Sequence, residues 1–130
     1  MFDDPAGPIE HFSWGKFVIC GKEHSDSEEG QSGVGKDIRL IGRDVTEWVE
    51  RKGHTLTKAM ITGIYDRGIE ILIIGIGVNG ALECPLEVKE KILSKGIKKV
   101  KLERTPQACA LYNKLFHQGK KVALLAHGTC

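Results

Sequence analysis

The chain is organised around residues 69–74, the run Ile-Glu-Ile-Leu-Ile-Ile, in which apolar and polar positions do not alternate. Such a run is typical of a strand buried on both faces, as parallel strands between helix layers are. Three glycines follow at G-x-G-x-x-G spacing, Gly75, Gly77 and Gly80, and they allow a sharp backbone turn. We therefore predict the central strand of an α/β sheet, with its carboxyl end left open.

The second half of the chain alternates between helix and strand patterns. Residues 85–96 and 105–119 show helical spacing, and each segment is opened by proline or Thr-Pro and closed by glycine. The lysine-rich segment 98–102 is expected to be a short strand, and the apolar run 122–126 is typical of a buried strand. Strand, helix, strand, helix and strand in this order imply right-handed crossovers and three parallel strands.

The first fifty residues favour antiparallel β structure. A strand is expected at 16–20, and a hairpin is expected from 37–41 and 45–50. Between them, the polar and glycine-rich residues 24–36 are predicted to be a mobile loop. Residues 1–12 contain two prolines and a glycine in close succession. We predict that they are disordered or loosely ordered ahead of a single domain at 13–130.

Past Gly53 the apolar spacing becomes nearly helical, which predicts another helix before the central strand, although Gly63 inside it costs about 1 kcal/mol. The apolar positions are Leu56, Ala59, Met60, Ile64 and Tyr65. The expected fold is a three-layer α/β arrangement. In it, a mostly parallel central sheet is flanked by helices and joined by an extra N-terminal antiparallel β layer.

Composition narrows the class of protein only a little. The chain has 130 residues, a net charge of +2 and 28% charged residues, without the basic clustering that nucleic acid or an anionic membrane surface requires. No apolar run approaches the roughly 18 residues of a spanning helix, and the N-terminus lacks the apolar core of a signal peptide. The four cysteines form no C-x-x-C motif, so we expect free thiols and a cytoplasmic protein.

The candidate site lies where the three parallel strands end, because open α/β sheets bind ligands at the carboxyl ends of their strands. Glycine backbone, a cation, an imidazole and a thiol are expected to converge there. The candidate ligand niche consists of Gly75, Gly77, Asn79, Gly80, Arg104, His127, Thr129 and Cys130.

Two phosphate-loop patterns have simpler interpretations. Residues 30–36 spell G-x-x-x-x-G-K, but Asp37 replaces the magnesium-binding hydroxyl and a strand pattern follows, so we interpret them as a flexible loop. The glycines after the central strand are better placed for a dinucleotide, with Glu103 in the position of the ribose-binding acid. However, the next helix begins only at Pro85, and a tight turn with a backbone-lined niche is favoured.

The segment 127–130, His-Gly-Thr-Cys, suggests thiol chemistry, because a neighbouring imidazole can activate a cysteine. Two potential ligands fall short of a metal site, and Cys84 could approach but nothing in the sequence requires it. We therefore predict no metal and no cofactor. The simplest interpretation is that His127 and Thr129 are hydrogen-bonding residues that complete the last strand.

Five motifs together resemble the adipogenesis-associated Mth-domain family, small proteins of unknown function related to the mitochondrial respiratory complex I assembly factor 3. The resemblance covers residues 12–130 and is thin over 22–52. It implies a three-layer α/β fold with a small extra antiparallel layer, and it supplies no catalytic mechanism. The motifs are Ser13-Trp14-Gly15, His54-x-Leu56, Gly75-x-Gly77-x-x-Gly80-Ala81-Leu82, Tyr112-Asn113 and His127-x-Thr129-Cys130.

The leading hypothesis is a soluble, non-enzymatic interaction, assembly or regulatory module. Its expected partner is an unidentified protein, with no nucleic acid and no membrane, and the chain itself is expected to be a monomer or weak homo-oligomer. Either Trp14 or Trp48 could anchor that partner, or both could pack inside the β portion. The alternative is a small ligand-binding or redox enzyme that uses the niche at the strand ends.

Overall fold

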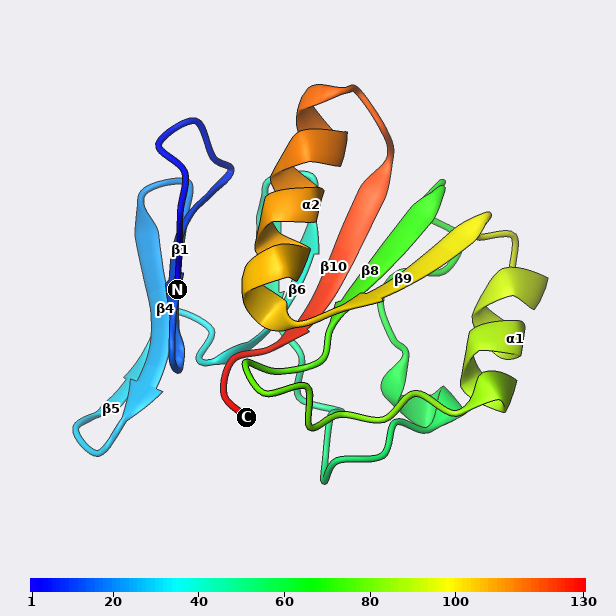
Figure 1. Cartoon of the computed structure of the whole chain (residues 1–130), viewed down its shortest axis with the longest axis horizontal. Coiled ribbons are helices and arrows are strands. Elements are labelled where there is room, and N and C mark those ends of the chain that lie inside the picture. Colours follow the sequence, from blue (N-terminus) through cyan, green and yellow to red (C-terminus); the bar gives the residue numbers. More distant parts are fainter.

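The computed structural model describes residues 1–130 and contains two five-stranded sheets (Figure 1). The first sheet is antiparallel and follows chain order: β1 (Phe2–Asp3), β2 (Ile9–Ser13), β3 (Lys16–Ile19), β4 (Lys22–Ser27) and β5 (Gly30–Ser32). The second sheet has the order β7-β6-β10-β8-β9. Its strands are β6 (Asp37–Ile41), β7 (Asp44–Glu47), β8 (Ile71–Gly75), β9 (Lys99–Glu103) and β10 (Val122–His127).

Two α-helices and one short 3₁₀ turn complete the fold. The turn is η1 (Lys58–Met60), and the helices are α1 (Leu86–Ser94) and α2 (Thr105–His117). Pro85 lies at the position just before α1, one residue earlier than the helix itself, and Pro106 lies in the first turn of α2, where its missing N–H removes no helical hydrogen bond. Both helices were expected at these places.

The second sheet is mixed, which corrects the expectation of a mostly parallel sheet. β8 pairs in parallel with β10 on one side and β9 on the other, as predicted. The β6–β7 hairpin was expected in the N-terminal layer, but β6 instead pairs antiparallel with β10. This placement covers the free edge of a buried apolar strand and satisfies its backbone groups.

The mixed sheet has a hydrophobic core on each face, and adjacent residues of β8 and β10 pack alternately into one core and the other. This confirms that these strands are buried on both faces. Ile73 and Leu124 pack on the face covered by α2 and the antiparallel sheet. Leu72 and Leu125 pack on the opposite face, with α1 and the apolar residues of 48–64. All four side chains are fully buried.

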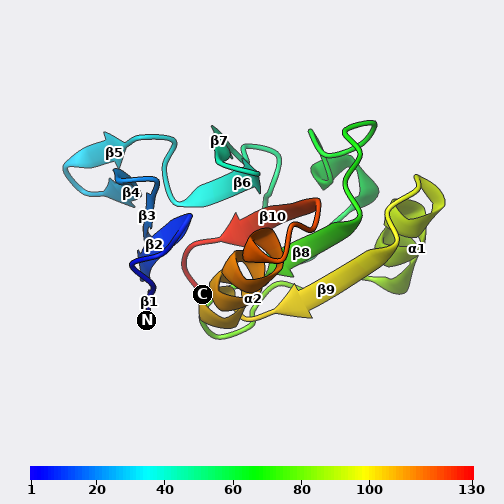
Figure 2. The same ribbon diagram turned by 90° about the horizontal axis from the view of Figure 1, so that it is seen from above.

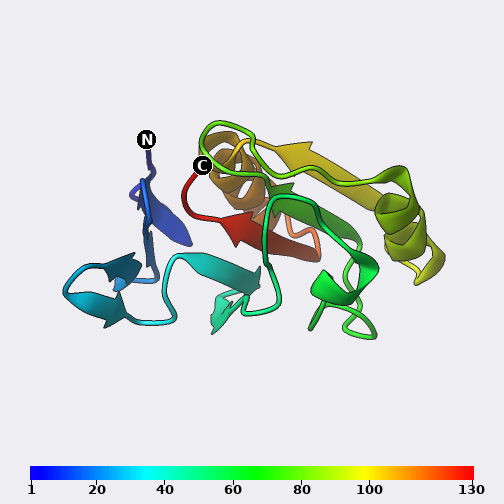
Figure 3. The same ribbon diagram turned by 90° about the horizontal axis from the view of Figure 1, so that it is seen from below.

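The two faces of the mixed sheet are therefore covered differently. Helix α2 lies across one face, with the antiparallel sheet beside it, whereas α1 lies beyond β9 at the far end of the molecule (Figures 2 and 3). The antiparallel sheet buries one of its faces, because Phe12, Phe17 and Ile19 join the same core as α2.

The first residues of the chain form the strands β1 and β2 and the turn between them, whereas a loosely ordered segment was expected. Ile9 and Phe12 are fully buried, and Asn113 of α2 hydrogen-bonds both backbone groups of Ile9, at 3.0 and 2.8 Å. The prolines and the glycine form the turn between two strands, and the burial of those strands offsets the entropy of ordering them.

Residues 24–36 are also more regular than expected, because β4 and β5 form a hairpin that pairs with β3. The segment is polar because most of its side chains face solvent. His24 is the exception: it is buried, and its Nδ1 accepts a hydrogen bond from Val34 N at 3.1 Å. No helix follows residues 30–36, which agrees with the rejection of a phosphate loop.

The helix expected around residues 56–65 does not form, although Leu56 and Ile64 are buried as the spacing suggested. Only η1 is helical, and Gly63 has a left-handed φ of 72°. Arg39 of β6 donates to the carbonyl of Thr62 at 2.8 Å, and a side chain at Gly63 would overlap its guanidinium. A tertiary contact therefore replaces the helical hydrogen bonds.

Candidate functional site

The three parallel strands end side by side, as the sequence predicted. Gly75 at the end of β8 pairs with Ala126 of β10 and with Glu103 of β9. The glycine turn after β8, the start of α2 and the end of the chain consequently meet at one edge of the mixed sheet (Figure 1).

The glycine turn is occupied by the chain's own last residues. Val78 N donates to the carbonyl of Thr129 at 2.7 Å, and the amides of Asn79 and Ala81 donate to the carbonyl of Cys130 at 3.2 and 3.0 Å. Gly77 has a φ of 101°, and a Cβ there would overlap the Cys130 carbonyl. The glycines thus permit a close approach of backbone to backbone, and the amides of residues 78, 79 and 81 already have acceptors.

Thr105 at the start of α2 ties the strand ends together. Its hydroxyl donates to the carbonyl of His127 at 2.7 Å and accepts from Gly77 N at 3.0 Å. Thr105 is fully buried, so its hydroxyl needs both partners. The sequence predicted Thr105 as the cap of the helix, but the cap position is Arg104, and the Thr105 hydroxyl makes these two tertiary hydrogen bonds instead.

His127 is held from the opposite side by a carboxylate of β6. Its Nδ1 lies 2.8 Å from Oδ1 of Asp37, and only 2% of His127 is exposed. The same carboxylate accepts from Gly128 N at 3.1 Å and pairs with Arg51 at 2.9 Å. Burial favours the neutral acid, but the hydrogen bonds from His127 and Arg51 outweigh it and hold the pKa of Asp37 below its ordinary value.

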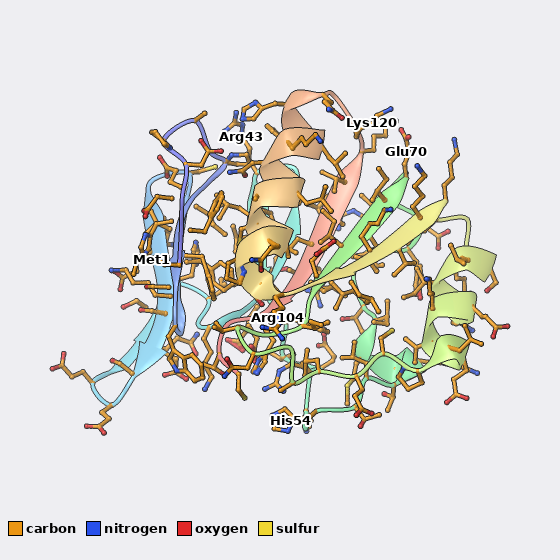
Figure 4. All side chains as sticks on the ribbon, viewed as in Figure 1. Met1, Arg43, His54, Glu70, Arg104 and Lys120 are labelled. Atoms are coloured by element: carbon orange, nitrogen blue, oxygen red, sulfur yellow. The ribbon has the colours of Figure 1, made fainter.

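Cys130 lies between two imidazoles. Its Sγ is 3.4 Å from Nε2 of His54 and 3.7 Å from Nε2 of His127, whose Nε2 is also 3.2 Å from the Thr129 hydroxyl. His54 is exposed and belongs to the irregular segment after β7 (Figure 4). In space, this segment lies close to Cys130. His54 lies 76 positions before Cys130, so spacing along the sequence gave no signal for this contact.

Arg104 is exposed at the rim of this edge, beside Gly80. The eight residues of the expected niche therefore do lie around one edge of the sheet, but they form a packed junction, and no cavity is lined by any of the eight. A neighbouring cavity is lined by Asp37 and Arg51, on the far side of His127. The role of the eight residues as a ligand site stays a prediction. Four further residues that the sequence did not indicate as site residues also lie at this edge: His54, Asp37, Arg51 and Thr105.

Residues 9–127 match a family described as protein of unknown function (DUF498/DUF598). The chain belongs to this family. Together with the similarity to MT938 described below, the match confirms the resemblance indicated by the glycine turn and the segment 127–130.

Solved structures share the fold at low sequence identity. A conserved hypothetical protein, PH1505 from Pyrococcus horikoshii, has a TM-score of 0.74 at 22% identity, covering 94% of this chain and 98% of that one. MT938 has a TM-score of 0.71 at 22% identity, with 94% and 97% covered. A protein from Bartonella henselae, described as an outer membrane protein, reaches 0.74 at 23%, with 95% of each chain covered. In the present chain, neither helix has the length and apolar character needed to cross a membrane.

Proposed function

We propose that this protein is a non-enzymatic interaction module, of an assembly or regulatory kind, that binds a protein partner through Trp14. The supporting observation is the contrast between the two tryptophans. Trp48 is fully buried and its indole N–H donates to the carbonyl of Met60 at 2.8 Å, whereas Trp14 is 59% exposed. Exposed tryptophans on firm supports are typical anchors of protein interfaces.

The turn that carries Trp14 is firmly supported. Gly15 N donates to the carbonyl of Gly128 at 2.6 Å, which joins the β2–β3 turn to the segment after β10. On the other side, Asp26 N of β4 donates to the carbonyl of Gly15. An aromatic side chain on a rigid support loses little conformational entropy when it binds, which favours affinity.

The glycine turn also supports binding over catalysis, because residues 129 and 130 use its amides and fill the space that a substrate backbone or phosphate would need. The proposal includes a cytoplasmic location, which suits four free cysteines. The partner is expected to carry an apolar pocket into which the indole ring of Trp14 fits.

The test places a photo-crosslinking amino acid at position 14 and, as a control, at Leu93, which is 41% exposed on α1. The proposal expects a discrete adduct at position 14 that untagged wild-type protein competes away, and no such adduct at 93. The captured protein is then purified, and Trp14→Ala should weaken its binding at least about 30-fold, whereas Leu93→Ala should have little effect. Equal adducts at both positions, or unchanged affinity of Trp14→Ala, would refute the proposal.

A thiol-dependent ligand-binding or redox enzyme is the second candidate, favoured by the two imidazoles beside Cys130, either of which could accept the thiol proton. It predicts that iodoacetamide alkylates Cys130 much faster than the exposed Cys20 at neutral pH. A Cys130 that reacts no faster than Cys20 would remove this candidate.

A further inference from the structure

We infer that His54, His127 and Cys130 form a zinc-binding site. Their three ligand atoms lie within 4.8 Å of one another, and the three residues come from two parts of the chain that only the fold brings together. Imidazole nitrogen and cysteine sulfur are the ligands that zinc prefers. The inference does not depend on a partner at Trp14.

Two of the three separations between ligand atoms fit tetrahedral coordination. With Zn–S near 2.3 Å and Zn–N near 2.0–2.1 Å, sulfur and nitrogen ligands lie about 3.5 Å apart. Cys130 Sγ is 3.4 Å from Nε2 of His54 and 3.7 Å from Nε2 of His127. Both sulfur–nitrogen separations therefore already match a shared metal ion.

The buried ligand is oriented as a metal ligand should be. Because Nδ1 of His127 donates to the Asp37 carboxylate at 2.8 Å, the lone pair is on Nε2, the atom that faces Cys130. A carboxylate behind a histidine is a common second-layer partner of zinc and raises the basicity of the ligand. The hydroxyl of Thr129, 3.2 Å from the same Nε2, would turn away when the metal binds.

The exposed ligand has a fixed backbone and a free side chain. Glu83 N donates to the carbonyl of His54 at 2.7 Å, and Leu56 N donates to the carbonyl of Glu83 at 2.9 Å. Two nitrogen ligands of one zinc ion lie closer together than the 4.8 Å limit within which these ligand atoms fall. Because the imidazole of His54 is exposed, it can rotate and bring its nitrogen nearer to that of His127.

When zinc binds, the covalent S–H bond of Cys130 breaks and an S–Zn bond forms. The proton passes to solvent, and no atom changes its oxidation state. Three protein ligands leave a fourth position for water or for an added donor, as in zinc sites that exchange ligands. The site would therefore take Zn²⁺ together with one small oxygen, nitrogen or sulfur ligand.

The test titrates the untagged, reduced full chain with ZnCl₂ in competition with a zinc-binding dye, and separately with CoCl₂. One zinc per chain is expected, with a thiolate-to-cobalt charge-transfer band. Cys130→Ser should abolish this band and weaken zinc binding at least about 100-fold, and His54→Ala should weaken it at least about 10-fold. Cys20→Ser, which alters an exposed thiol elsewhere, should bind zinc as the wild type does.

Circular dichroism and urea unfolding check that each variant is folded. The inference would be overturned if the wild type bound zinc no more tightly than Cys130→Ser does. It would also be overturned if His54→Ala bound zinc with wild-type affinity. The cobalt spectrum of the unaltered chain tests thiolate ligation even where a variant fails to fold. A cobalt complex without a charge-transfer band would equally rule out the site.

Discussion

The two sheets of this protein achieve burial in different ways. In the mixed sheet, β8 and β10 are covered on both faces, and neighbouring residues such as Leu72 and Ile73 are equally buried. In the antiparallel sheet, Phe17 of β3 is fully buried whereas its neighbour Val18 is only half-buried. A strand buried on both faces has a continuous apolar run in its sequence. A strand buried on one face has only an alternation of apolar and polar positions, which is harder to recognise where strands are short and joined by polar turns.

The largest effect should come from the antiparallel sheet. Phe17→Ala removes a fully buried ring whose centroid lies 4.7 Å from that of Phe12, and we expect it to lower the free energy of unfolding by about 3–5 kcal/mol. Val18→Ala should cost about 1 kcal/mol or less, since the side chain is partly solvated. Urea unfolding of both variants measures the difference, and equal losses would show that both faces of this sheet are buried.

In the mixed sheet, neighbouring substitutions should have similar effects. Leu72→Ala and Ile73→Ala each create a cavity, on opposite faces, and each should lower the free energy of unfolding by about 2–5 kcal/mol. The same urea assay applies. If one of the pair cost less than about 1 kcal/mol, the comparison between the two sheets would fail.

The glycine turn allows a test with a matched control. Gly77 and Gly96 have similar φ values of 101° and 96°, but a Cβ meets the Cys130 carbonyl at Gly77 and nothing within 4 Å at Gly96. Gly77→Ala should cost about 2–4 kcal/mol and Gly96→Ala about 1–2 kcal/mol, because the first adds overlap to backbone strain. Equal losses of stability would mean that residues 129 and 130 do not occupy the turn.

The smallest effect concerns the link between α2 and the antiparallel sheet. Asn113 of α2 hydrogen-bonds the backbone of Ile9 in β2, so Asn113→Ala leaves buried groups unpaired and should cost about 1–3 kcal/mol. It should also speed amide hydrogen exchange in β1 and β2 more than in β8. Asn79→Ala, at an exposed position, serves as the control and should change stability by less than about 0.5 kcal/mol. Uniform exchange changes throughout the chain would contradict a local link.

The elements that the sequence predicted best are those with strong local patterns. β8, β9 and β10 were found within two residues of their observed ends, and α1 and α2 were marked by Pro85 and Thr105-Pro106. The convergence of their ends, and hence the meeting of Gly75, Glu103 and Ala126, followed from the parallel arrangement alone. Local signals and the handedness of crossovers were sufficient there.

The sequence failed where long-range contacts override local preference. Arg39 hydrogen-bonds the non-helical backbone beside Gly63, and Asn113 hydrogen-bonds a segment whose sequence looks disordered. His54 could not be assigned to the site, because its contact with Cys130 joins residues 76 positions apart and depends on the tertiary fold.

The sequence by itself therefore determined the buried strands, the helices and the edge at which they end, because burial and capping leave periodic marks along the chain. Only the tertiary structure decided that the hairpin β6–β7 joins the mixed sheet and that Asp37 orients His127. It alone also brought His54 to Cys130, because contacts between distant segments depend on packing geometry, which leaves no local mark in the sequence.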